Sequence, residues 1–210
     1  RIIQKSLLED TPYGFESGGD PKAIPDLTYE MFLNFHRTYY HPSNSYIYLY
    51  GNMDMEEKLA FLDEHYLSHF DYLDVDSVIQ EQKEFGACRD VTLEYPVAEN
   101  EGEEDNTYLS YNMVVGNAAD SQMAMAFEVL DYALLSAPGA PLKQALLDVK
   151  AGKDVYGSYD DGILQPYFTV IAKGSNPDRK EEFVSVIRQV LGDIVKNGID
   201  RKAVEAGINY

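Results

Sequence analysis

Histidine pairs are the first residues to test for chemistry in this chain, because two imidazoles on one helical face can share a metal ion. Four histidines are present: His36, His41, His65 and His69. Only His65 and His69 have the four-residue spacing that places two side chains on the same face. Glu64 is adjacent to His65, but neighbouring helical residues point in different directions, so it completes no three-ligand set. The pair is interpreted as an exposed helix end, with a metal role as the alternative.

Nucleophilic and paired acidic side chains give no stronger signal. Cys88 has no histidine near it in the sequence, and no catalytic motif surrounds Ser17 or Ser110. Asp160 and Asp161 lie at an expected tight turn, where aspartate is favoured for backbone reasons. The sequence therefore predicts no catalytic, cofactor-binding or metal-ligating residue in this chain.

Charge restricts the possible partners. The 210 residues include 36 Asp and Glu against 17 Lys and Arg, a formal net charge of −19. Phosphate binding needs clustered Lys and Arg, so no nucleic-acid partner is expected. Solubility is the preferred interpretation, and attraction of basic peptides is the alternative. Five acids form a predicted solvent-facing hairpin tip; if they faced bound peptide instead, they would favour basic ones: Glu99, Glu101, Glu103, Glu104 and Asp105.

Compartment and completeness can also be judged from the sequence. No apolar run approaches the ~20 residues of a membrane span, so no membrane partner is expected. The first ten residues lack the shape of a signal peptide, and the single cysteine cannot form an internal disulfide. These features favour the cytoplasm, with an organelle matrix as the alternative. The sequence does not begin with Met, so we expect a piece of a longer chain.

Residues 27–51 are the first stretch with a clear pattern of elements. Their sequence predicts a helix, a proline that ends it and a short buried strand. Thr28 is a natural N-cap, and Pro42 ends the helix because it donates no hydrogen bond. Residues 46–50 (YIYLY) are β-branched and aromatic, as in a short buried strand. A second helix is predicted from Asp54 to residue 70. Both helices carry an expected buried stripe at three- and four-residue spacing: Phe32, Phe35 and Tyr39, then Leu59, Leu62, Tyr66 and Phe70.

The rest of the chain predicts a linker and a second domain. Residues 71–90 have no clear period and are expected to connect residues 1–70 to residues 91–210. Strands are expected at 91–97 (an edge strand), 106–116, 154–160 and 164–173, and helices at 119–136, 142–149, from 176 or 178 to 197, and from 200 onwards. Hairpins with helices packed to one side give an α+β fold, an antiparallel sheet layered against helices.

A family resemblance is carried by three runs: residues 13–21 (YGFESGGDP), residues 24–32 (IPDLTYEMF) and residues 35–44 (FHRTYYHPSN). Together they resemble the pitrilysin/insulinase family of zinc metallopeptidases, most closely its presequence-protease branch. Later pieces are similar to the family's second domain, among them LKQAL at 142–146 and YFTV at 167–170. The resemblance implies pitrilysin-type domains, which are mitochondrial-processing-peptidase-like metallohydrolase domains. It places residues 1–70 at the end of the first, peptidase domain.

The resemblance also implies that the zinc ligands of the family lie outside these residues. The family binds zinc through an HxxEH pair on a helix plus a later Glu, and no HxxEH occurs here. Ser68 stands between His65 and His69 where that motif needs Glu. Glu9 lacks the surroundings of the third ligand and is not assigned. We therefore expect zinc in the longer parent protein and none in this piece.

Three functions follow as alternatives. The first is a wall and scaffold piece, inactive alone, of a zinc metalloendopeptidase that encloses and degrades unstructured peptides. Its partners would be the peptide and the remaining halves of the parent chain. The second is a non-catalytic structural or partner subunit of the same family, and the third is an acidic peptide-binding module. A cluster of tyrosines is interpreted as core and sheet surface, with peptide contact as the alternative: Tyr39, Tyr40, Tyr46, Tyr48 and Tyr50.

Overall fold

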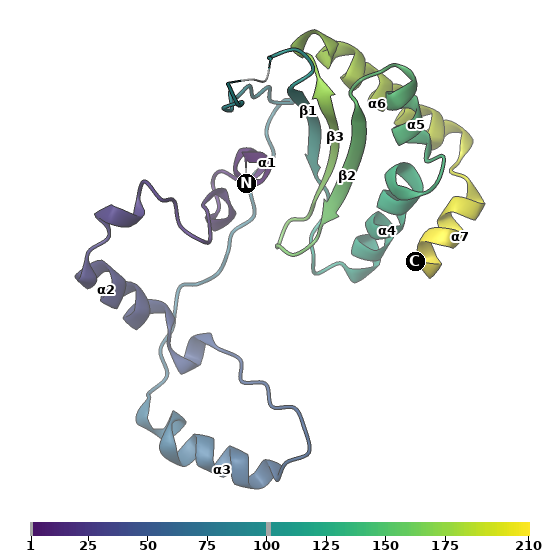
Figure 1. The fold of residues 1–210 in the computed structure, drawn as a ribbon. Coiled ribbons are helices and arrows are strands. Elements are labelled where there is room, and N and C mark those ends of the chain that lie inside the picture. The colour runs from purple at the N-terminus through teal and green to yellow at the C-terminus, as the bar shows by residue number, and fades with distance from the viewer. Residues whose placement is uncertain (1, 100–101) are drawn as a thin grey trace. The chain divides into compact units, whose positions relative to one another are not determined.

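The computed structural model describes residues 2–99 and 102–210 of the chain (Figure 1). Contacts divide it into two compact units: residues 1–15 with 81–210, and Glu16–Gln80. The predicted linker, 71–90, is therefore shared between the units, and the first fifteen residues belong with the later part of the chain. Where the domains of a longer protein meet stays a prediction.

The larger unit is built on a three-stranded antiparallel sheet of order β1-β3-β2. Its strands are β1 (Thr107–Val114), β2 (Asp154–Asp160) and β3 (Tyr167–Ser175). In the register, Asn112 and Ser158 both lie opposite Thr169 of the central strand. The three strands predicted at 106–116, 154–160 and 164–173 are confirmed, with β3 starting three residues later than expected.

Helices α4, α5 and α6 lie along one face of the sheet (Figure 1). The sequence predicted these three helices and a fourth that follows them in the chain. They are α4 (Ser121–Asp131), continued by a π-helical turn (Tyr132–Ser136), α5 (Pro141–Asp148), α6 (Lys180–Asn197) and α7 (Arg201–Asn209). Helix α6 starts later than predicted because Pro177 opens a 3-10 turn, Pro177–Arg179, before it. Gly198, at φ 87°, ends α6 in a conformation that only glycine adopts readily.

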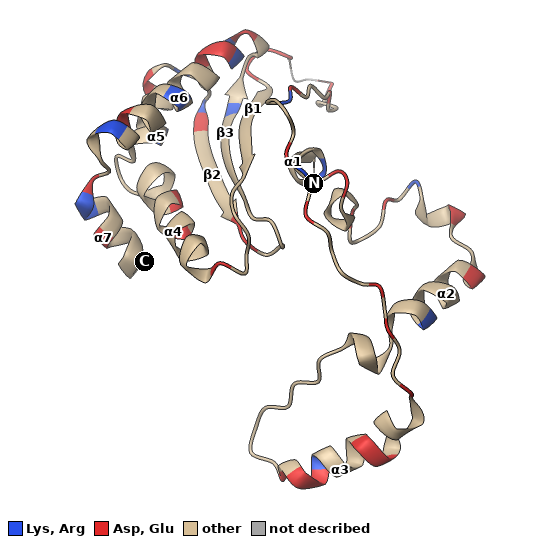
Figure 2. Ribbon diagram, turned by 180° about the vertical axis from the view of Figure 1, so that it is seen from behind, with Lys and Arg blue, Asp and Glu red and all other residues tan. Residues whose placement is uncertain are grey.

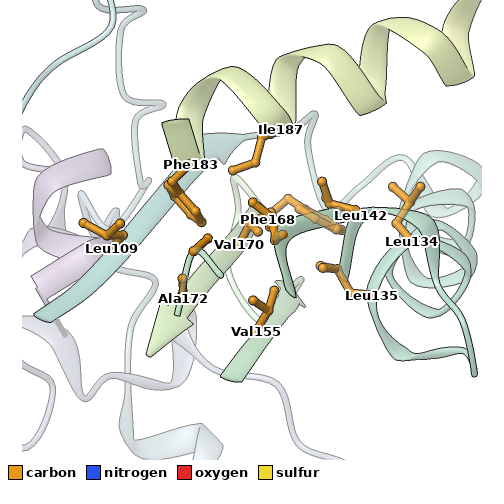
Figure 3. Packing of buried hydrophobic residues seen from close by; sticks show 12 residues of the cluster. Leu109, Leu134, Leu135, Leu142, Val155, Phe168, Val170, Ala172, Phe183 and Ile187 are labelled. Carbon is orange, nitrogen blue, oxygen red and sulfur yellow. The ribbon is translucent and has the colours of Figure 1, made fainter. Parts of the chain in front are cut away.

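The hydrophobic core lies between this sheet face and the helices (Figure 3). Val155, Phe168, Val170 and Ala172 project from the strands, because alternate residues of a strand share a face. Leu142, Leu146, Phe183 and Ile187 meet them from α5 and α6, each no more than 1% exposed. Burial of these side chains supplies the main driving force for folding of the larger unit. This layering confirms the predicted α+β class.

The smaller unit contains α2 (Tyr29–Tyr39) and α3 (Met55–His65). Both predicted N-caps are confirmed: the Thr28 hydroxyl accepts the Met31 amide at 3.2 Å, and the Asp54 carboxylate accepts the Glu57 amide at 3.0 Å. Shorter helical segments complete the chain: α1 (Ile2–Leu7) and the 3-10 turns Pro12–Gly14, Ile24–Asp26, Pro42–Asn44 and Leu67–His69. None of the described helices is both long and apolar enough to cross a membrane.

Burial in the smaller unit is where the sequence prediction is wrong. Residues 46–50 form no strand, and Tyr46, Tyr48 and Tyr50 are 103%, 85% and 85% exposed. The α2 stripe is exposed as well, with Phe32 66% and Phe35 59% exposed. A β-type sequence becomes a strand only beside a partner strand, and no described residue pairs with this segment. The buried stripe predicted for the second helix is exposed too: Leu59 lies exposed on α3, and Tyr66 and Phe70 lie exposed just after it.

The prediction of an edge strand at residues 91–97 is also wrong. These residues run without regular structure and are exposed along their whole length. One side chain of the segment attaches it near β1, because the Tyr95 hydroxyl donates to the Asn106 carbonyl and its ring lies 5.7 Å from that of Tyr108. In the predicted hairpin tip, Glu101 lies outside the described residues, and Asp105 adopts φ 57°.

Candidate functional site

The histidine pair does not share a helical face. Helix α3 ends at His65, and Tyr66 leaves helical geometry at φ −136° and ψ −65°. His69 belongs to the following 3-10 turn, so the four-residue spacing no longer aligns the two imidazoles. The His65 ring lies 4.5 Å from that of Phe61, measured between centroids. Within residues 2–99 and 102–210, no group of three or more His, Cys, Asp and Glu could hold a metal ion.

The acidic tip is fixed at one end by Asp105. The Asp105 amide donates to Asn176 Oδ1 at 2.8 Å, and Asn176 Nδ2 donates back to the carboxylate at 2.7 Å. Lys153 Nζ lies 3.3 Å from the other carboxylate oxygen. The Asn176 hydrogen bond, followed by those of Lys153 and its charge, lowers the pKa of Asp105. Acidic residues elsewhere are spread over both units rather than gathered on one element (Figure 2).

Asp160 and Asp161, the neighbouring acids at the β2–β3 turn, have different surroundings. Asp160 accepts a hydrogen bond from the Tyr167 hydroxyl at 2.7 Å. Burial, then this hydrogen bond and the Asp160 charge, raises the pKa of Tyr167 to about 12. Asp161 is exposed in the connecting turn. Asp160 is therefore engaged by Tyr167 while Asp161 is exposed, and these surroundings do not mark the two acids as an acid–base pair.

The remaining candidate nucleophiles also have structural surroundings. Cys88 is exposed, with its sulfur 4.0 Å from the Arg89 carbonyl oxygen. The Ser110 hydroxyl accepts a hydrogen bond from the Asn112 side-chain amide at 3.0 Å. Neither arrangement supplies the adjacent base that activates a nucleophile.

Polar and aromatic side chains gather on the sheet face that α4, α5 and α6 leave free. We call it the free face, and it carries Tyr108, Ser110, Asn112, Tyr156, Ser158, Tyr167, Thr169, Ile171 and Lys173. The Ser158 and Thr169 hydroxyl oxygens are 3.1 Å apart, and Lys173 Nζ lies 5.9 Å from the Tyr108 ring centroid. Hydroxyl, amide and aromatic groups of this kind suit contacts with peptide main chain.

The free face is only partly open to solvent. Thr169 is 2% exposed, whereas Tyr156 and Tyr108 are 39% and 47% exposed. Asn112 Oδ1 is buried and has no hydrogen-bond partner among the described residues. The spacing of Ser110 and Asn112 placed them together on one side of a strand, but no sequence pattern linked them to Thr169 or Ser158.

Comparison with protein families identifies the domain type. Residues 26–210 match the family model described as the peptidase M16 inactive domain. The chain is 46% identical over 209 residues to the protein HypA of Clostridium perfringens, covering 100% of this chain and 22% of HypA. It is 35% identical over 213 residues to presequence protease 1, chloroplastic/mitochondrial, of Arabidopsis thaliana, covering 100% and 20%. It thus spans about a fifth of these relatives.

A comparison with solved structures agrees on the fold. The structure of an M16-like peptidase from Alicyclobacillus acidocaldarius superposes with a TM-score of 0.56 at 18% sequence identity. The superposition covers 98% of this chain and 48% of that one. At this identity the likeness concerns the fold alone.

Proposed function

This chain belongs to the peptidase M16 family, and from that premise we propose that it is the non-catalytic wall of a metalloendopeptidase that encloses and degrades unstructured peptides. The observation that carries the proposal is the match of residues 26–210 to the inactive domain type, together with relatives named presequence protease. The catalytic work would then belong to parts of a longer protein, because the chain spans about a fifth of those relatives.

Zinc is the metal that the resemblance to this family implies. The described residues do not fit a zinc site, because they contain no cluster of three His, Cys, Asp or Glu side chains and the His65–His69 pair is broken by the end of α3. Structural and catalytic zinc sites both need at least three protein ligands. We therefore assign the metal to the remaining part of the longer protein and no step of the reaction to this chain.

The free face is the part of this chain that we assign to peptide contact. The opposite face is filled by the core, whereas Tyr108, Tyr156 and Lys173 of the free face are exposed. Its Asn112 amide and its hydroxyls can hydrogen-bond main-chain groups of an extended peptide, which requires no particular peptide sequence. Tyr156→Ala in the longer protein should raise KM for peptide cleavage about threefold, equivalent to ~0.6 kcal/mol. Val195→Ala, on the exposed side of α6, is the matched control and should leave KM unchanged.

The partners and the compartment are proposals of the same kind. The partners are an unstructured peptide and the remainder of the longer chain, which would complete the enclosure. We propose the cytoplasm as the compartment, with an organelle matrix as the alternative, from the sequence features alone. Fractionation of the source cells followed by immunoblotting tests this assignment.

The deciding experiment measures zinc content and cleavage of a fluorogenic unstructured peptide, for the 210-residue chain and for the longer protein. We expect one zinc per longer protein with cleavage, and neither for the 210-residue chain. Zinc bound by the short chain would overturn the assignment of the metal elsewhere, and His65→Ala would then identify the site. A longer protein without zinc or cleavage would favour a non-catalytic relative and refute the proposal.

A further inference from the structure

Two segments frame the smaller unit in the sequence, and both belong to the larger one. Residues 1–15 precede Glu16–Gln80, and residues from Glu81 onwards follow it. The chain therefore leaves the larger unit through residues 9–15 and returns to it through residues 81–89; we call these two segments the neck. Side chains of the two neck segments contact each other at two places.

The first contact joins Gln82 to Asp10. Gln82 Oε1 accepts the Asp10 backbone amide at 2.8 Å, and Gln82 Nε2 donates to the Asp10 carboxylate at 2.7 Å. Gln82 is 7% exposed, unusually low for a glutamine, and nearly all of its polar capacity is used inside the protein. Its side chain thus pairs both a donor and an acceptor of a residue 72 positions away.

The second contact joins Arg89 to Glu9. Arg89 Nη1 and Nη2 donate to the two Glu9 carboxylate oxygens at 2.7 and 3.1 Å, a two-bonded geometry that fixes orientation as well as distance. The guanidinium carbon also lies 4.5 Å from the Phe85 ring centroid. The same neck segments are therefore fastened twice, at neighbouring residues of the first segment.

The neck is also fastened to the β2–β3 connection. Gln165 Oε1 accepts the Gln82 backbone amide at 2.5 Å, and Gln165 Nε2 donates to the Gln82 carbonyl at 3.3 Å, as a neighbouring strand would. The Leu164 amide donates to the Tyr13 hydroxyl at 3.2 Å. Both neck segments are thus held against the sheet that carries the free face.

We propose that Glu9, Asp10, Gln82 and Arg89 form a clip that fixes the two neck segments to each other and to the sheet of the larger unit. The clip is a positioning device: it holds the free face in a constant relation to the start of the neck. Its effect on catalysis rests on the proposed function, but its existence does not.

Amide hydrogen exchange on the longer protein tests the clip directly. Gln82→Glu places a second carboxylate beside Asp10, and like charges should open the first contact. We expect at least tenfold faster exchange of the Asp10 and Gln82 amides, with no change at Val170 in the central strand. Arg201→Ala is the control, because Arg201 pairs with Glu205 at 3.0 Å on α7, away from the neck. Unchanged exchange at Asp10 would overturn the clip.

A charge swap gives a second, independent readout. Glu9→Arg should accelerate exchange in the neck, and the double variant Glu9→Arg with Arg89→Glu should restore protection, because the pair is reformed with reversed charges. In the longer protein, the single variant should lower kcat for peptide cleavage at unchanged thermal stability, and the swap should recover it. Failure of the swap to restore protection refutes the clip. An unaltered longer protein that cleaves no peptide refutes the proposed function instead and leaves the exchange result standing.

Discussion

Replacing Gly157 with alanine should destabilise the sheet unit through a steric conflict in β2. A Cβ atom built at this position lies 2.2 Å from the Thr169 carbonyl oxygen and 2.4 Å from Leu135 Cδ1, roughly 1 Å short of ordinary contact. Overpacking of this kind costs about 1–3 kcal/mol, and the reduced freedom of the unfolded chain offsets about 0.4–1 kcal/mol. The net loss should be about 1–2 kcal/mol, which lowers Tm by about 2–8 °C at this chain length.

The assay is urea unfolding of the 210-residue chain, followed by far-ultraviolet circular dichroism. Gly192→Ala is the matched control, because Gly192 lies within α6 and its added Cβ has no atom within 4 Å apart from its chain neighbours and the backbone of its own helix. Alanine there should stabilise by about 0.5–1 kcal/mol. Opposite signs for the same chemical change would confirm that packing, not glycine flexibility, decides the outcome. A Gly157→Ala variant as stable as the unsubstituted 210-residue chain would refute this reasoning.

Three further substitutions test burial and ionisation. Leu146→Ala should lose about 2–5 kcal/mol, since the side chain is fully buried and leaves a cavity, and urea unfolding measures the loss. Burial raises the pKa of Asp131, and a weaker hydrogen bond with Ser136 opposes this shift. At pH values above the pKa of this carboxyl in the unfolded chain, burial of the ionised form therefore lowers the free energy of unfolding. Asp131→Asn should accordingly stabilise at pH 7, with the gain disappearing below pH ~4; a gain that persists in acid contradicts the burial explanation. Tyr167, with a pKa of about 12, stays neutral after unfolded tyrosines ionise, so stability should fall between pH ~10 and 12. Tyr167→Phe should remove that part of the alkaline loss, and equal pH profiles would contradict it.

Local signals in the sequence were sufficient for most elements of the fold. Thr28, Asp54, Asp120 and Asp200 each cap the helix that follows, as their types and positions predict. The strands and helices from β1 to α7 follow from short-range periodicity, because their buried faces meet within the same stretch of chain. Residues 46–50 carry the same kind of signal but form no strand, since a partner strand is a non-local requirement.

The family assignment follows from the sequence alone, because long runs such as residues 35–44 specify it without any knowledge of contacts. Only the tertiary structure separated His65 from His69, because the end of α3 between them depends on the backbone of Tyr66. Only the tertiary structure joined Asp10 to Gln82, which lie 72 positions apart and match no motif. Hydrogen bonds between distant polar residues leave no periodic trace in a sequence. Helix caps and apolar stripes act over a few residues, and the sequence therefore determined those by itself.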